Sequence, residues 1–166
     1  MLTTNRTYRS SLAVILGLAA ISLVFTSCNV SDSSGSGGLE VEEWLINENE
    51  VVDGGPGIDG IPSIENPAFA TTSSTDDFQD NRRIAALRIG NELRAYPHQI
   101  LDQHEIVNHQ VNGREVTLTF CPLTGTSIGV DREQTGGGLE FGVSGLLFRN
   151  NLIMYDRNTG STWSQM

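Results

Sequence analysis

The sequence contains no lysine, so all ten of its basic residues are arginines, and they stand against 20 acidic residues. The net charge is −10 over 166 residues, and removal of Arg6 and Arg9 with an N-terminal leader would leave −12. Nucleic acids and anionic lipid surfaces both select positively charged proteins. The composition therefore argues against nucleic acid as a partner and against charge-driven binding to lipid headgroups.

Long apolar runs are also lacking. The N-terminal run at 12–25 is 14 residues long, whereas a membrane-spanning helix needs about 20. Arg6 and Arg9 precede this run, and two small residues separate it from Cys28. A short apolar run between a positive region and a small-residue box is typical of an export signal.

These first residues resemble a bacterial lipoprotein signal, although Phe25 stands where leucine is usual. The resemblance implies a signal peptide at 1–27 and lipidation of Cys28, with an ordinary secretory signal as the alternative. A flexible, acidic tether would follow at 28–50, since Ser and Gly dominate 31–38. We expect an exported protein, held at the membrane by its lipid and facing the periplasm or the cell exterior.

The remaining residues, 51–166, are enough for one domain, and turn signals divide them into short segments. Gly90-Asn91 predicts a hairpin between 84–89 and 92–96, and Asn112-Gly113 predicts a second. Pro97 suits the first position of a helix, and apolar spacing predicts that this helix covers 97–107. The expected fold is mainly β (α+β), an antiparallel sheet built from successive hairpins with one short helix.

The segment 116–121 alternates, with Val116, Leu118 and Phe120 on one face and Cys121 on the other, less apolar face. Further strands are predicted around 128–130, 139–143 and 152–156. The sequence ends inside another predicted strand at 161–166, so the domain is expected to be incomplete at its C-terminus.

Cys121 is the main candidate for chemistry, because the predicted lipid would occupy the only other cysteine. A lone thiol in an exported protein is either a reactive group or a small buried hydrophobe. Thr124 lies where a Cys-x-x-Cys pair has its second cysteine, and its hydroxyl could support a thiolate but could not close a disulfide.

His104 is predicted on the apolar side of the helix, as a core residue or as a base or ligand beside Cys121, with Glu105 next to it. Cys121 and His104 could instead bind copper or zinc. His98 and His109 are expected at the surface. Two sequence pairs are interpreted as structural ion pairs or as anion sites, namely Asp131-Arg132 and Asp156-Arg157.

Seven blocks of this chain resemble the prokaryotic family called domain of unknown function 3179. The blocks are Asp59-Gly60-Ile61-Pro62 with Asn66-Pro67, Arg94-Ala95-Tyr96-Pro97, His104-Glu105-Ile106-Val107-Asn108, Phe120-Cys121-Pro122-Leu123, Phe141-Gly142-Val143-Ser144-Gly145, Met154-Tyr155-Asp156-Arg157 and Trp163-Ser164-Gln165.

The family has no established activity. Many members have Cys-Pro-Leu-Cys where this chain has Cys121 and Thr124, and some carry selenocysteine at the second position. The resemblance therefore implies redox chemistry at Cys121. This chain departs from the family at Thr124, and also at Gln103, where members usually have tryptophan.

Three functions stay open at this point. The first is a thiol-redox site with Cys121, Thr124, His104 and Glu105. The second is a copper- or zinc-binding module that uses Cys121 and His104. The third is a structural or interaction domain in which Cys121 only packs.

Overall fold

The structure is a computed structural model that describes residues 39, 43–74, 81–135 and 138–166, all within the unit Ser34–Met166. The predicted signal peptide, Cys28 and most of the predicted tether lie outside the described residues. Within the described ranges, no helix is long and apolar enough to cross a membrane.

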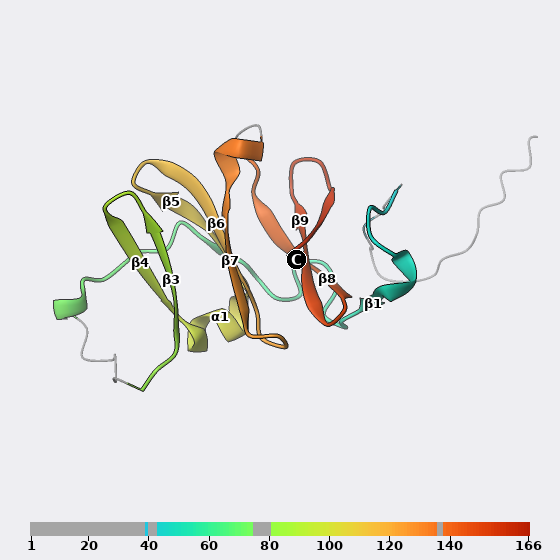
Figure 1. Cartoon of the computed structure of the whole chain (residues 1–166), viewed down its shortest axis with the longest axis horizontal. Coiled ribbons are helices and arrows are strands. Elements are labelled where there is room, and N and C mark those ends of the chain that lie inside the picture. The colour runs from blue at the N-terminus through green and yellow to red at the C-terminus, as the bar shows by residue number, and fades with distance from the viewer. Residues whose placement is uncertain (1–38, 40–42, 75–80, 136–137) are drawn as a thin grey trace, which may run out of the picture. The chain divides into compact units, whose positions relative to one another are not determined.

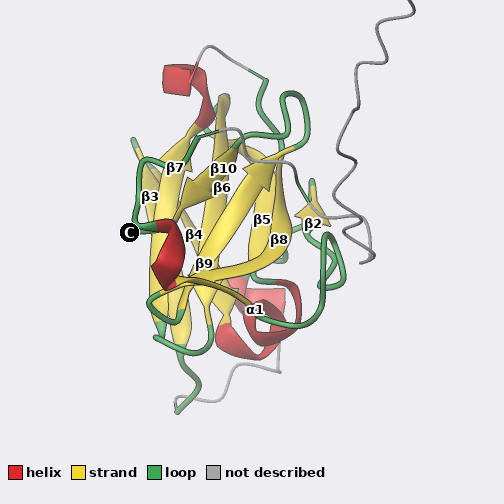
Figure 2. Ribbon diagram, turned by 90° about the vertical axis from the view of Figure 1, so that its right-hand side faces the viewer, coloured by secondary structure: helices red, strands yellow, loops and turns green. Residues whose placement is uncertain are grey.

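Short strands dominate the described chain, and their arrangement is drawn in Figures 1 and 2. In chain order the elements are η1 (Glu48–Glu50), β1 (Val51–Asp53), β2 (Ile64–Glu65), η2 (Thr72–Ser74), β3 (Ile84–Ile89), β4 (Glu92–Pro97), α1 (His98–His104), β5 (Ile106–Val111), β6 (Arg114–Cys121), β7 (Thr126–Asp131), η3 (Arg132–Thr135), β8 (Phe141–Phe148), β9 (Asn151–Asp156) and β10 (Thr162–Ser164). The expected class, mainly β with one short α-helix, is confirmed.

The strands form more than the one sheet that was expected. Sheet A has the order β1-β8-β9-β10, sheet B has the order β2-β5-β6-β7, and β3 and β4 form a separate pair, hairpin C. Every pairing is antiparallel apart from the two-residue pairing of β2 with β5.

Both predicted hairpin turns are confirmed. Asn112 and Gly113 have φ values of 51° and 75°, and a type I′ turn needs positive φ at both central residues. This turn sets the register of β5 on β6, in which Val111 pairs with Arg114. Gly90, at φ 58°, turns β3 into β4.

Sheet B is buried on both faces. One face packs against hairpin C and α1 in a cluster formed by Ala85, Tyr96, Leu101, Val107, Leu118 and Phe120. The other face packs against sheet A in a cluster formed by Ile106, Cys121, Phe141, Val143, Leu152 and Met154. The predicted alternation along β6 is therefore confirmed. The face that bears Cys121, predicted to be the less apolar one, is covered by sheet A, and Cys121 is buried there.

The helix is shorter than predicted. It ends at His104, and Glu105 adopts φ 57°, which helical residues do not adopt. Val107, predicted on the helix, lies in β5 instead. His109 follows in the same strand and is 2% exposed, so its predicted surface position was also wrong.

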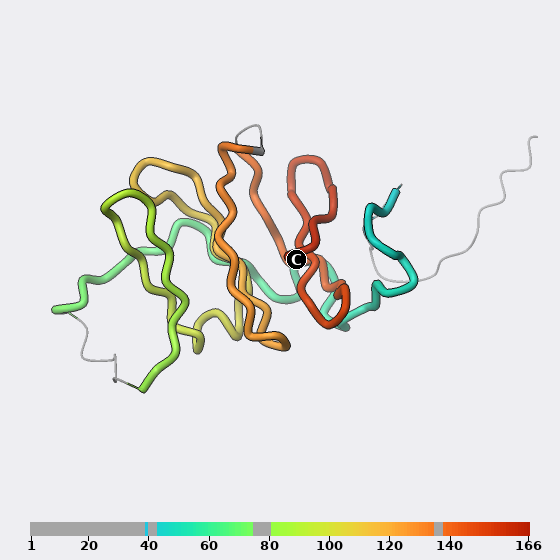
Figure 3. Tube along the Cα trace, viewed as in Figure 1, coloured from blue at the N-terminus to red at the C-terminus, as the bar shows by residue number. Residues whose placement is uncertain are grey.

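The segment 54–69 connects sheet A to sheet B and hairpin C, and Figure 3 traces its course between β1 and β3. Gly54 N donates to Gly145 O, and farther along Asn66 N donates to Asn108 O. Gly145 has φ 82°, and a Cβ there would lie 2.8 Å from backbone atoms of Gly57. A glycine at 145 is thus what lets this segment lie directly on β8.

Candidate functional site

The fold brings two of the predicted site segments to the same end of sheet B. The backbone N–H of Phe120 donates to the carbonyl oxygen of Glu105 at 2.7 Å, which extends the β5–β6 ladder by one pair. The end of α1, with His104 and Glu105, therefore lies beside the end of β6, with Cys121.

The thiol itself is enclosed. Cys121 is the free cysteine of the described chain and is 2% exposed. Its S–H points to the carbonyl oxygen of Asn150, with 3.6 Å between sulfur and oxygen. A carbonyl oxygen only accepts hydrogen bonds, so the thiol is the donor in this contact. In this conformation Cys121 is a covered thiol and not an exposed nucleophile.

Two buried amide oxygens at this end of the described domain have no hydrogen-bond partner among the described residues. Asn151, next to Asn150, donates from Nδ2 to Thr124 Oγ1 at 2.9 Å, while its Oδ1 is buried without a hydrogen bond. Gln165 donates to Thr119 Oγ1 at 2.8 Å, and its Oε1 is likewise buried and unpartnered. Buried acceptors without donors are uncommon and often mark a functional site or a place for water or an ion.

Thr124 does not contact the thiol in the way the sequence suggested. Its Oγ1 accepts the hydrogen bond from Asn151, so it helps to hold the β8–β9 turn over Cys121. Gln165 contacts the same region of sheet B, because its Nε2 also lies 3.2 Å from the carbonyl oxygen of Thr126, which pairs with Cys121.

Glu105 is the titratable group at this end of sheet B with the clearest perturbation. Burial, which disfavours the charged carboxylate, raises its pKa from 4.5 to about 7. Its backbone N–H donates to Leu101 O at 2.8 Å, which closes the last turn of α1 in spite of the positive φ. A carboxyl group with a pKa near neutrality can both give and take a proton under physiological conditions.

One ring nitrogen of His104 is engaged in a hydrogen bond to the backbone. Its Nδ1 lies 2.8 Å from the carbonyl oxygen of Pro62, so Nδ1 must carry the hydrogen that this bond requires. In the neutral ring Nε2 is then the nitrogen with a free lone pair. That arrangement suits a base or a metal ligand.

The predicted copper or zinc site gains no further ligands. No group of three or more His, Cys, Asp or Glu side chains among the described residues could hold a metal ion. Cys121 and His104 would therefore need donors of another kind, such as amide oxygens.

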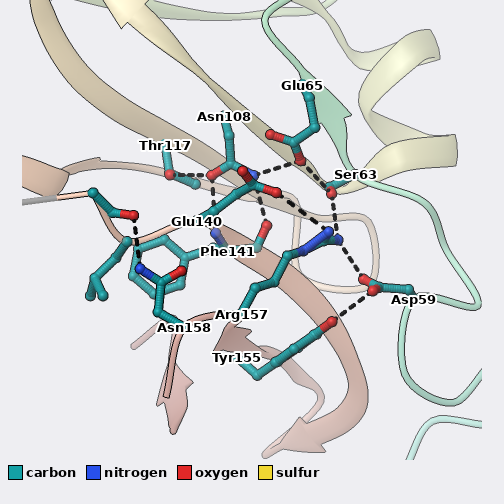
Figure 4. A network of polar contacts seen from close by, with 12 residues as sticks. Asp59, Ser63, Glu65, Asn108, Thr117, Glu140, Phe141, Tyr155, Arg157 and Asn158 are labelled. Atoms are coloured by element: carbon teal, nitrogen blue, oxygen red, sulfur yellow. Dashed lines mark hydrogen bonds and ion pairs between the residues drawn. The ribbon is translucent and has the colours of Figure 1, made fainter. Parts of the chain in front are cut away.

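A second polar cluster joins segment 54–69 to both sheets (Figure 4). Asp59 accepts from Tyr155 Oη at 2.6 Å and from Arg157 Nη2 at 2.7 Å. Arg157 also donates to Ser63 at 3.0 Å, and Ser63 donates to Glu65 at 2.8 Å. Burial, with the hydrogen bond to Asp59, raises the pKa of Tyr155 to about 12, so Tyr155 remains a donor at neutral pH.

Asn108 completes this cluster from sheet B. Its Nδ2 donates to Glu65 Oε1 at 2.9 Å and to Phe141 O at 2.7 Å, and its Oδ1 accepts from Thr117 at 2.6 Å. Each polar atom of this buried side chain is used. The cluster therefore holds β5, β8 and segment 54–69 together through hydrogen bonds. Several residues of the blocks that resemble the family thus have a structural role in this domain.

The two acid-arginine sequence pairs make contacts outside the pair. Arg157 forms ion pairs with Asp59 and, at 3.5 Å, with Glu140. Asp156 accepts from Thr159 and from the indole N–H of Trp163. Asp131 pairs with Arg114, while Arg132 donates to the carbonyl oxygens of Leu139 and His109.

Sequence reasoning missed a third polar group, around His109. Tyr96 Oη lies 2.7 Å from His109 Nε2, and His109 Nδ1 lies 3.1 Å from Gln110 O. Phe69 packs against both rings, and the Arg94 guanidinium lies 4.6 Å from the centre of the Phe69 ring. Strand alternation across 107–111 could have placed His109 with Val107 and Val111, but this stretch also fitted the end of a helix.

Together these observations define a mainly β domain in which the one cysteine of the described residues is enclosed, with His104 and the perturbed carboxyl of Glu105 at the same end of sheet B. The chain belongs to the family described as "Protein of unknown function (DUF3179)", whose model matches residues 58–166. No curated protein and no solved structure matches the chain.

Proposed function

We propose that this domain is a single-cysteine redox module, in which Cys121 is oxidised by a small hydroperoxide to a sulfenic acid. The observation that supports this most is a pair of buried amide oxygens that have no hydrogen-bond partner among the described residues. They are Asn151 Oδ1, in the residue after Asn150, and Gln165 Oε1, whose amide nitrogen binds Thr119 on the Cys121 face of β6. The reduced thiol has one hydrogen to donate, and Asn150 O receives it. A sulfenic acid has an O–H group that one of the spare amide oxygens could accept.

The chemistry needs only the thiol and the peroxide. The sulfur forms a bond to the terminal peroxide oxygen, the O–O bond breaks, and the thiol hydrogen ends on the leaving oxygen. The products are Cys–SOH and an alcohol, or water when the oxidant is hydrogen peroxide. Sulfur loses two electrons and the peroxide gains them. Thr124 cannot form a disulfide, so the oxidised form must be reduced by an external thiol.

Burial of Cys121 favours a small oxidant over a protein disulfide. A peroxide molecule needs only a brief displacement of the Asn150 turn, whereas disulfide exchange needs in-line access for a second sulfur. Glu105, whose pKa is about 7, and His104 supply proton-exchanging groups at the same end of sheet B. The predicted export would place the domain in an oxidising compartment.

The test is the rate of peroxide oxidation of Cys121, trapped with dimedone and located by peptide mass spectrometry so that Cys28 is counted separately. A redox site reacts from the folded state, so we expect a rate that does not change in low, non-denaturing urea. Cys121→Ser should give no adduct at this position.

The opposing result is equally measurable. A cysteine that only packs reacts through unfolding, so its rate follows the unfolding equilibrium. A destabilised variant with Cys121 intact, Gly142→Ala, would then be oxidised much faster than the wild type. Such a rise in proportion to the unfolding constant would refute the redox proposal and favour a structural role.

A further inference from the structure

A polar hollow of about 330 Å³ opens on the side of sheet B that faces away from Cys121. Its lining residues are Asn66, Pro67, Phe69, Arg94, His109 and Gln110. We propose that this hollow, called here the Arg94 hollow, binds a small organic monocarboxylate through the Arg94 guanidinium. The proposal is independent of the thiol, because His109 pairs with Val116 on the face of sheet B that hairpin C covers, and Cys121 lies on the other face.

The buried side of the hollow is polar but uncharged. Gln110 O can only accept, so His109 Nδ1 carries a hydrogen and His109 Nε2 accepts from Tyr96 Oη. Burial lowers the pKa of His109 and raises that of Tyr96, so both rings are neutral at pH 7. Arg94 is therefore the cationic side chain among the residues that line the hollow.

Arg94 is positioned in advance for an oxygen ligand. Its guanidinium stacks over Phe69, which limits its rotamers, and its Nη2 donates to Glu92. Its Nε is buried without a hydrogen-bond partner. A planar guanidinium that is held by stacking and still has N–H groups to offer suits a carboxylate.

The charge balance selects a monoanion. Glu92 offsets part of the Arg94 charge through its Oε1, while its Oε2 accepts from Asn112 N at 2.9 Å. The chain as a whole carries −10. A dianionic phosphate would meet little net positive potential here, whereas one carboxylate requires a single charge-assisted contact. Phe69 and His109 contribute aromatic rings to this mainly polar hollow, and these rings can contact the body of a small aromatic ligand.

The experiment uses sodium benzoate as the probe, titrated into the full chain and followed by ¹⁵N-resolved NMR at the Arg94 side chain and the His109 amide. Benzamide has the same ring without the charge, and inorganic phosphate has the charge without the ring. We expect saturable shifts with benzoate in the millimolar range, as one charge-assisted contact in an open hollow supports. Benzamide and phosphate should bind at least about tenfold more weakly.

Arg94→Gln should weaken benzoate binding by at least about tenfold. Arg88→Gln, which removes the same charge from the exposed face of the same hairpin, should leave binding unchanged. If Arg94→Gln does not fold, the second variant is Asn66→Asp, which adds a repelling carboxylate at another lining residue, leaves Arg94 unchanged and should also weaken benzoate binding. Absence of saturation, equal binding of benzamide, tighter binding of phosphate, or equal effects at Arg88 and Arg94 would each overturn the proposal.

Discussion

Gly142→Ala should be among the most damaging methyl additions in this domain. A Cβ at position 142 would lie 2.6 Å from Asp59 Oδ1, 2.6 Å from Tyr155 Cε1 and 2.9 Å from Arg157 Nη2. All three distances are well below ordinary van der Waals contact. The added methyl group must therefore displace the cluster that fastens segment 54–69 to sheet A.

The magnitude of the stability loss follows from three contributions. Overpacking of a buried position costs about 1–3 kcal/mol. The hydrogen bond from Tyr155 to Asp59 contributes about 1 kcal/mol. The Arg157–Asp59 ion pair adds no more than about 0.5–1 kcal/mol, because its side chains are 29% and 36% exposed. We therefore expect the free energy of unfolding to fall by about 2–5 kcal/mol, a large part of the ~5–15 kcal/mol typical of a domain.

Urea denaturation at pH 7, followed by far-ultraviolet circular dichroism, measures this loss. Gly129→Ala is the matched control, since its Cβ would meet only the flexible end of Leu87, at 2.8 Å from Cδ1. We expect that control to change stability by less than about 1 kcal/mol. In an Asp59→Ala background the Tyr155 ring is released and can move aside, so Gly142→Ala should cost about 1 kcal/mol less there. A loss no larger than that of Gly129→Ala would contradict this reasoning, and so would an equal loss in both backgrounds. Either result would show that the close contacts at Gly142 do not determine the loss of stability.

Two further predictions concern single titratable or hydrogen-bonded groups. The pKa of Glu105 is raised from 4.5 to about 7, so the folded protein retains a proton that the unfolded chain loses between these pH values. Stability should therefore decline by about 1–2 kcal/mol, after allowance for partial exposure, as pH rises from 5 to 8. Urea midpoints of Glu105→Gln should lack this decline, and an unchanged slope would contradict the assignment. Tyr96→Phe leaves His109 Nε2 buried without its hydrogen-bond donor. It should lower the free energy of unfolding by about 1–3 kcal/mol in the same urea assay. A loss under about 0.5 kcal/mol would mean that another donor, for instance water, replaces the tyrosine hydroxyl.

The hairpins were predictable because short-range chemistry decides them. Asn112-Gly113 tolerates positive φ at two successive positions, and Gly90 tolerates it at one. The side-chain alternation along β6 follows directly from strand geometry. These features depend on neighbours within a few residues, so the sequence alone contains the information.

The boundary between α1 and β5 was not predictable in the same way. Apolar residues at 100, 101, 104 and 107 fit a helix, yet Val107 lies in a strand. The helix ends because Glu105 adopts φ 57° and the chain then pairs with β6. No glycine or asparagine marks this position, so the tertiary pairing decided it, and His109 was misplaced as a result.

The sequence by itself determined the class of fold, the family, the turns and which side chains share a strand face. Only the tertiary structure decided that the face bearing Cys121 is covered, since alternation does not reveal whether a second sheet packs there. It also decided the partners of Asp59, because Tyr155 is 96 residues away and no local pattern links them. The thiol is consequently an enclosed group that contacts the carbonyl oxygen of Asn150, which was not evident from Cys121 and Thr124 alone.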